Sequence, residues 1–118
     1  MELLVVEKHD GCGVFPLFTK GTAVNDLEAN NEYSMHAEAI WGKDSVSHWL
    51  SCTINGYNTY IPDLYVSGGV LARDYNPTEI VVEKGQFLTL IALVFEWAYV
   101  RDENGEKGWL PVNKIISK

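Results

Sequence analysis

The feature that most constrains the fold is a pattern that occurs twice along the chain. Residues 49–67 and residues 97–117 each begin with Trp, continue through a short run and a glycine turn, and then show an aromatic residue, an aliphatic residue and Pro. The two Trp residues are 48 positions apart and the two Pro residues 49, so the segments align with only small gaps. Agreement in this many special residue types predicts two copies of one structural unit.

Local signals within the repeat predict short antiparallel strands. Asn55-Gly56 and Asn104-Gly105 are tight-hairpin signals, because both central residues of a type I′ turn need positive φ. No stretch of ten or more residues keeps a clean apolar period of 3.6. Helix is therefore expected only as single 3₁₀ turns just after Pro62 and Pro111. The chain is predicted to be all-β.

A short linker is predicted between two modules. Ser67-Gly68-Gly69 separates residues 1–67, the first module, from residues 70–118, the second. Because the linker is short, the modules are expected to sit close together. A domain of about 60 residues buries only about 60% of its unfolded surface, so two such modules gain stability by packing against each other.

The second half, residues 70–118, resembles the SH3 family over nearly its whole length. Residues 71–75, Leu-Ala-Arg-Asp-Tyr, resemble the family's Ala-Leu-Tyr-Asp-Tyr strand, and residues 79–88 resemble its diverging turn. Trp97 stands where the first ligand-binding Trp belongs, and residues 108–113 are similar to the Gly-Tyr-Ile-Pro-Ser-Asn segment. The resemblance implies two tandem SH3-like small β-barrels packed together, of a bacterial type.

The first half is a more divergent copy of the same pattern. Its segment 49–66 matches well, and Lys20-Gly21 corresponds to Lys84-Gly85. The distance from this glycine to the next repeat Trp is 28 residues in the first half and 12 in the second. Either an insertion lies within residues 25–48, or a strand at residues 32–40 replaces the usual one.

The resemblance also implies where a ligand would bind. SH3 domains bind proline-rich peptides in slots between aromatic rings, because a preformed polyproline helix loses little entropy on binding. Carried over by motif position, the ligand-binding residues are Tyr75, Trp97, Trp109, Pro111 and Asn113 in the second half, and Trp49, Tyr60, Pro62 and Tyr65 in the first. Arg73 and Lys114 stand where the family has Tyr, so each half keeps only part of the groove. The alternative is that these aromatic residues pack the barrels.

One predicted strand is apolar on both faces. Residues 87–95 carry leucines that can face the core, yet Phe87, Ile91 and Leu93 are apolar on the other face. A strand with one face in water alternates apolar and polar residues. The outer face is therefore predicted to pack against the first module, with a homodimer contact as the alternative.

The composition limits the partners and the compartment. A net charge of −7 opposes binding to nucleic acid or to an anionic membrane surface, since both need basic residues. No apolar run approaches the roughly 18 residues of a membrane span, and the N-terminus lacks a basic signal-peptide start. Two cysteines do not make a disulfide framework. The chain is expected in the cytoplasm, as a monomer or a homodimer.

Candidate catalytic and metal-binding residues are sparse. His9, Cys12, His48 and Cys52 are ligand types that suit zinc, but their spacing is loose, and buried or solvated side chains are the simpler interpretation. A nucleophilic Cys12 would need a base that the fold brings to it, and adjacency to His9 in the sequence does not supply that geometry. Cys52 aligns with Val100, an expected core position. No metal, cofactor or catalytic activity is predicted.

These features predict a non-enzymatic cytoplasmic binding module that recognises a peptide or a protein through SH3-type aromatic surfaces. The alternative is an acidic inhibitor or immunity protein that blocks a basic toxin or enzyme by charge complementarity. The contact in that case would be the acidic residues Asp26, Glu28, Glu32, Glu38 and Asp44. Salt separates the two predictions, because charge-steered association slows at high salt whereas an aromatic groove binds almost equally well.

Overall fold

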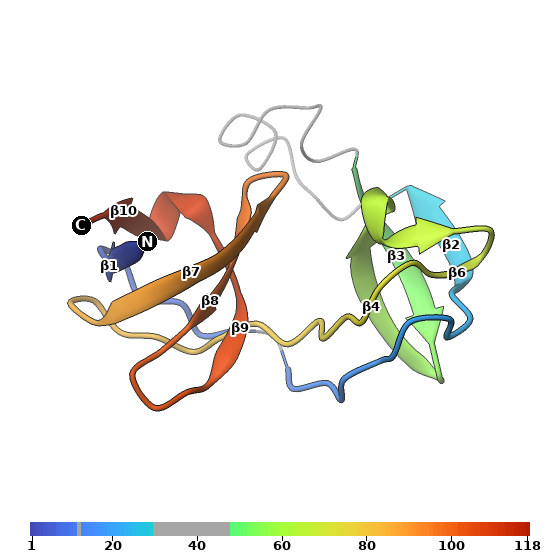
Figure 1. The fold of residues 1–118 in the computed structure, drawn as a ribbon, viewed down its shortest axis with the longest axis horizontal. Coiled ribbons are helices and arrows are strands. Elements are labelled where there is room, and N and C mark those ends of the chain that lie inside the picture. The colour runs from blue at the N-terminus through green and yellow to red at the C-terminus, as the bar shows by residue number, and fades with distance from the viewer. Residues whose placement is uncertain (12, 30–47) are drawn as a thin grey trace. The chain divides into compact units, whose positions relative to one another are not determined.

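The computed structural model describes residues 1–11, 13–29 and 48–118 (Figure 1). The described residues form short strands and two single 3₁₀ turns, and none of them lies in an α-helix, so the all-β prediction is confirmed. In chain order the elements are β1 (Glu2–Val5), β2 (Asn25–Ala29), β3 (Trp49–Ile54), β4 (Tyr57–Pro62), η1 (Asp63–Tyr65), β5 (Val66–Ser67), β6 (Val70–Leu71), β7 (Phe87–Val94), β8 (Trp97–Arg101), β9 (Lys107–Pro111), η2 (Val112–Lys114) and β10 (Ile115–Ser117). Cys12, the alternative strand at 32–40 and most of the 25–48 segment lie outside the described residues.

The first unit combines the two ends of the chain, Met1–Val14 and Thr78–Lys118. Its antiparallel sheet has the order β10-β1-β7-β8-β9, so the N-terminal strand lies between β10 and β7 (Figure 1). Burial of apolar side chains under this sheet stabilises the unit. The core cluster consists of Leu3, Val5, Ile80, Val82, Leu88, Ala98, Val100 and Leu110.

A further segment, residues 78–82, runs along the edge of β9. The Ile80 N–H donates to the Trp109 carbonyl at 3.0 Å, and the Trp109 N–H donates to the Thr78 carbonyl at 3.0 Å. Gly108 lets the two backbones approach this closely, because a Cβ at this position would lie 2.7 Å from the Ile80 nitrogen. The edge of β9 is therefore covered by another part of its own unit, which protects an otherwise unpaired strand edge.

The second unit is the continuous segment Phe15–Pro77. It contains an antiparallel sheet with the order β2-β3-β4 and the two-stranded pair β5-β6. Strands β3 and β4 are joined by Asn55-Gly56, whose φ values of 50° and 84° are both positive. The predicted tight turn is therefore confirmed here.

The matching turn in the first unit is wider. Of Asn104-Gly105, only Gly105 has positive φ. The Asp102 carboxylate accepts hydrogen bonds from the backbone N–H groups of Asn104 and Glu106, at 2.8 and 2.9 Å. An Asp that bonds the backbone ahead of it stabilises a longer loop, so the hairpin forms as predicted but without the two-residue turn.

The repeat predicted from the sequence corresponds to a repeated local structure. Trp49 lies directly opposite Pro62 in the β3–β4 pair, and Trp97 lies directly opposite Pro111 in the β8–β9 pair. Each Pro is followed at once by a 3₁₀ turn, η1 or η2, and then by a short strand. Both predicted 3₁₀ turns are therefore confirmed.

The two units do not follow the predicted boundary between residues 1–67 and 70–118. Residues 1–14 belong with the C-terminal part of the chain, because β1 is hydrogen-bonded to β7 and β10. Residues 70–77 belong with the N-terminal part, because Leu71 and Tyr75 form backbone hydrogen bonds with residues 18–22. Ser67-Gly68-Gly69 is a hairpin turn inside the second unit, since Ser67 lies opposite Val70.

Candidate functional site

The predicted ligand-binding residues of the first unit differ in exposure. Trp109 is buried and stacks in a tilted arrangement on Tyr99, with ring centroids 5.0 Å apart. Pro111 is also buried, opposite Trp97. Asn113 is exposed in η2, and Trp97 is half-buried at the start of β8. Trp97 and Asn113 are therefore the two predicted residues of this unit with side chains that a partner can reach.

Tyr75 lies in the second unit, whereas Trp97 lies in the first. Its hydroxyl donates a hydrogen bond to the Tyr60 carbonyl at 2.6 Å, and its ring meets that of Tyr65 edge-on, with centroids 5.5 Å apart. Arg73 lies over the other ring, 4.7 Å from the Tyr65 centroid. Burial raises the pKa of Tyr65, and the nearby Arg73 charge opposes this rise. The expected grouping of Tyr75 with the second-half residues is replaced by a Tyr60–Tyr65–Tyr75 cluster.

The remaining first-half residues pack inside the second unit. Trp49, Pro62 and Tyr65 are buried, while Tyr60 is half-buried. Aromatic rings each bury a large apolar area, so rings in these positions stabilise a small unit strongly. Most of the predicted groove residues therefore contribute to packing, the alternative given for them above.

A cluster that the sequence did not predict lies beside Trp97. The His9 Nε2 is 2.8 Å from Glu79 Oε1, and the His9 Nδ1 is 3.1 Å from Lys114 Nζ. The His9 ring meets Trp97 edge-on, with centroids 6.2 Å apart. Glu79 and Lys114 lie 70 and 105 positions from His9 along the chain, so no local motif could reveal them.

The hydrogen bonds of His9 define its tautomer. The Lys114 ammonium has donors only, so His9 Nδ1 must accept and carry no proton. The proton of neutral His9 then lies on Nε2 and is donated to Glu79. The backbone of His9 is itself held by two hydrogen bonds to Val82, at 3.0 and 2.9 Å. The corner is therefore a preorganised polar network next to the half-buried Trp97 side chain.

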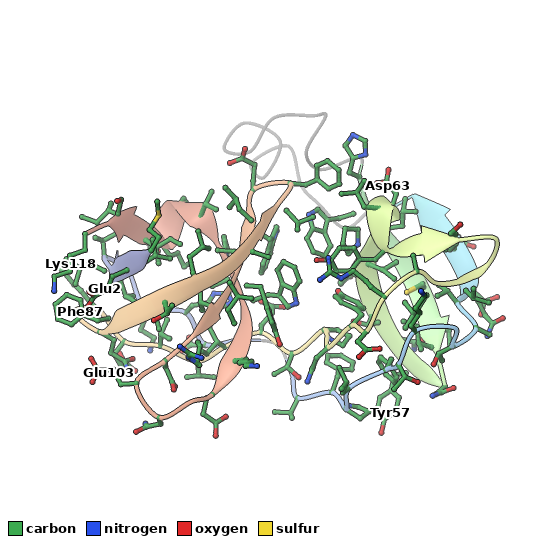
Figure 2. The ribbon with its side chains drawn as sticks, viewed as in Figure 1. Glu2, Tyr57, Asp63, Phe87, Glu103 and Lys118 are labelled. Carbon is green, nitrogen blue, oxygen red and sulfur yellow. The ribbon has the colours of Figure 1, made fainter. Side chains whose placement is uncertain are left out.

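The outer face of β7 is exposed at two of the three predicted positions. Ile91 and Leu93 are 47% and 62% exposed. Phe87 is half-buried, with the Lys118 ammonium 4.2 Å from its ring centroid. Figure 2 shows Lys118 next to Glu2 and Phe87. A cation over an aromatic face is favourable, so Phe87 has a partner in its own unit, and packing of this face against a second module stays a prediction.

The zinc and nucleophile candidates are distributed over both units and the part of the chain outside the described residues. His9 lies in the first unit, whereas His48 and Cys52 lie in the second, and Cys12 is outside the described residues. His48 Nδ1 is 2.6 Å from Asp63 Oδ2. Across residues 1–11, 13–29 and 48–118, no group of three or more His, Cys, Asp or Glu side chains could hold a metal ion.

Cys52 occupies the core position expected from its alignment with Val100, since both are buried. Burial raises the pKa of its thiol to about 11, from 9.0 in the unfolded reference. The thiolate is the reactive form. In a Cys12→Ser background we therefore expect alkylation by iodoacetamide to be slow at pH 8 and to rise about tenfold per pH unit toward pH 11, measured by mass spectrometry.

The same shift predicts a pH dependence of stability. Between about pH 9 and 11 the folded thiol keeps a proton that the unfolded chain loses, so the free energy of unfolding falls as pH rises through this range. A Cys52→Ala variant should lack this part of the decline. Rapid alkylation of the folded protein at pH 8, at the rate seen in urea, would contradict the expected protection of the thiol.

A polar hollow of about 340 Å³ lies on the β2-β3-β4 sheet. Asp26 and Glu28 come from β2, where the pairing with β3 is interrupted by a bulge, and Asp26 has a positive φ of 54°. Bulges bend a strand and redirect its side chains. The residues around the hollow are Asp26, Glu28, Ser51, Cys52, Thr53, Asn58, Thr59 and Tyr60.

The described residues thus define an all-β protein of two small units, with one polar–aromatic corner and one acidic hollow. A scan against protein-family models found no matching model, and searches of curated proteins and of solved structures found no similar chain. Within the part of the chain that the structure describes, no helix is long and apolar enough to span a membrane.

Proposed function

We propose that this protein is a non-enzymatic binding module of SH3-like type, and that it contacts a peptide or a protein surface at the Trp97 corner of the first unit. The observation that carries this proposal is the half-buried Trp97 side chain next to the His9–Glu79 pair. An aromatic ring that is fixed at a surface next to a carboxylate offers one apolar contact and one charged contact to a partner.

Two local features favour the SH3-like interpretation. Each unit has a Trp opposite a Pro, followed by a 3₁₀ turn and a short closing strand, as the resemblance implies. In the first unit Trp97 lies beside His9, and the bridge from His9 to Val82 joins the N-terminal segment to residues 78–82.

The chemistry of the corner suggests the class of partner. The side chains of His9 and Glu79 are 11% and 17% exposed, so the carboxylate is partly shielded from water and its charge is weakly screened. Lys114 is engaged with His9 and with the Lys8 carbonyl at 3.2 Å. A peptide with an apolar or proline side chain for the indole and a Lys or Arg directed at Glu79 would satisfy both contacts.

Selection of a displayed random peptide library on the full chain tests this proposal. Peptides enriched on the wild type should lose at least about tenfold in affinity for Trp97→Ala, as expected for a central aromatic contact. The matched control is Tyr57→Ala, an exposed aromatic residue of the second unit, which should bind as the wild type does. Equal binding of the selected peptides to the wild type and to Trp97→Ala would show that the peptides do not bind at this corner.

The acidic hollow supports a second candidate function, inhibition of a basic protein. Asp26 and Glu28 lie at its rim, and the chain carries a net charge of −7. A partner bound there should associate much more slowly at high salt and should be lost in an Asp26→Asn/Glu28→Gln variant. Binding at the Trp97 corner should respond to neither change as strongly, so the two candidate functions are separable.

A further inference from the structure

The same strand pairing occurs in both units, but the paired strands follow a different order along the chain. In the first unit Val5 of β1 lies opposite Ile115 of β10, and in the second Leu71 of β6 lies opposite Val66 of β5. Ile115 and Val66 each follow their repeat Pro by four positions. The repeat therefore makes Val5 and Leu71 equivalent, although one precedes the rest of its unit and the other follows it.

Backbone hydrogen bonds around these two residues agree pair by pair. Val5 and Leu71 each donate a backbone hydrogen bond to the carbonyl of the residue after the repeated Lys-Gly pair, and each accepts one from the N–H of that Gly. The residue after each of them donates to the carbonyl of the last residue of the 3₁₀ turn. The matching bonds are Val5 N to Gln86 O with Leu71 N to Thr22 O, Gly85 N to Val5 O with Gly21 N to Leu71 O, and Val6 N to Lys114 O with Ala72 N to Tyr65 O. His9 and Tyr75 are likewise bridged to Val82 and Phe18.

We propose that residues 1–67 and 70–118 are two copies of one unit that have exchanged their first strands within the chain. Residues 1–14 complete the unit built by 78–118, and residues 70–77 complete the unit built by 15–67. Each half of the chain therefore has a position for a first strand, which we call its seat, and the first strand of the other half occupies it. The two halves are thus each other's binding partners.

The burial of the exchanged strands explains why both seats must be filled. Leu3 and Val5 are buried among the side chains of β7, β8 and β9. Leu71 and Tyr75 are buried in the unit of the opposite half. An empty seat would expose this apolar surface and leave backbone groups on both sides of the missing strand without partners.

The short turn at Gly68-Gly69 explains why the exchange takes place. Both glycines have positive φ, 60° and 80°, so the chain reverses within two residues. Ser67 therefore lies opposite Val70, and the strand that begins there must pair with the end of the preceding half. A two-residue hairpin holds Val70 next to Ser67, so residues 70–77 begin beside the half of the chain that ends there. The first strand of the chain then takes the remaining seat.

Cleavage of the chain at this turn tests the exchange. A protease site inserted between the exposed Gly68 and Gly69 divides the chain into its two sequence halves. We expect the fragments to co-elute in native gel filtration at the position of the uncut protein and to separate in denaturant, because each completes the other. Two separately eluting, folded fragments would show that each half folds with its own first strand, and would overturn the proposal.

A disulfide cross-link in the full chain tests the strand exchange even if the cut protein unfolds. Leu4 lies opposite Ile116, and without exchange its partner would be the equivalent residue Ser67. In a background with Cys12→Ser and Cys52→Ala, the pair Leu4→Cys/Ile116→Cys should form a disulfide on oxidation, and the control pair Leu4→Cys/Ser67→Cys should not. After denaturation and cleavage, the first pair keeps both fragments in one band on a non-reducing gel. Cross-linking of the control pair alone would overturn the proposal.

Discussion

Replacement of Leu3 with Ala is expected to lower the free energy of unfolding by about 2–5 kcal/mol, the usual cost of truncating a buried leucine. Leu3 is 4% exposed and belongs to the core cluster that also contains Leu88 and Leu110. Its cross-strand neighbours are Leu88 of β7 and Ser117 of β10. The loss should therefore appear in the first unit, residues 1–14 and 78–118, and not in residues 15–67.

Two measurements check this expectation. Urea denaturation gives the change in the free energy of unfolding, and amide hydrogen exchange locates it along the chain. Leu4→Ala is the matched control, because Leu4 is half-buried on the opposite face of the same strand, and its cost should be near 1 kcal/mol or less. Faster exchange in β3 and β4, with β7 unchanged, would contradict the position of β1 in the first unit.

Replacement of Gly108 with Ala is expected to cost about 1–3 kcal/mol, because the added methyl has no space. Its Cβ would lie 2.7 Å from the Ile80 nitrogen and 3.0 Å from the Ile80 Cα, both backbone atoms. Gly108 is not among the glycines with positive φ, so the cost is steric rather than conformational. The clash should push residues 78–80 away from β9 and break the two hydrogen bonds with Trp109.

The control for this substitution lies one residue earlier. Lys107→Ala changes an exposed side chain on the same strand, so the melting temperature should change little. In the Gly108→Ala variant the amide of Ile80 should lose its protection from hydrogen exchange, and Glu79 should move relative to His9. A stable Gly108→Ala variant with Ile80 still protected would show that residues 78–82 do not cover the edge of β9.

Features that depend on a few neighbouring residues could be predicted from the sequence. The Asn55-Gly56 turn forms with both φ values positive, and 3₁₀ turns follow Pro62 and Pro111. Positive φ is favourable for Asn and Gly, and Pro has a restricted φ, so these signals act whatever the rest of the chain does. The buried position of Cys52 could also be predicted, because alignment of the two copies placed it on a core position.

The candidate site depends on contacts that no local pattern contains. His9, Glu79 and Lys114 come from three distant parts of the sequence, and they meet beside Trp97 because residues 1–14 are part of the first unit. Tyr75 was expected beside Trp97 on the basis of its place in the chain, yet it packs with Tyr60 and Tyr65. Both outcomes have the same cause, which is the unit that each first strand joins.

The sequence by itself determined that the chain is all-β, that its two halves repeat, and that each repeat has a Trp–Pro pair and a 3₁₀ turn. Only the tertiary structure decided which first strand completes which unit, and therefore which side chains share a surface. The physical reason is that a strand can form its hydrogen bonds and bury its apolar face in either of two similar seats. The two-residue turn at Gly68-Gly69 holds residues 70–71 beside residues 66–67 and therefore favours one of these two seats for that strand.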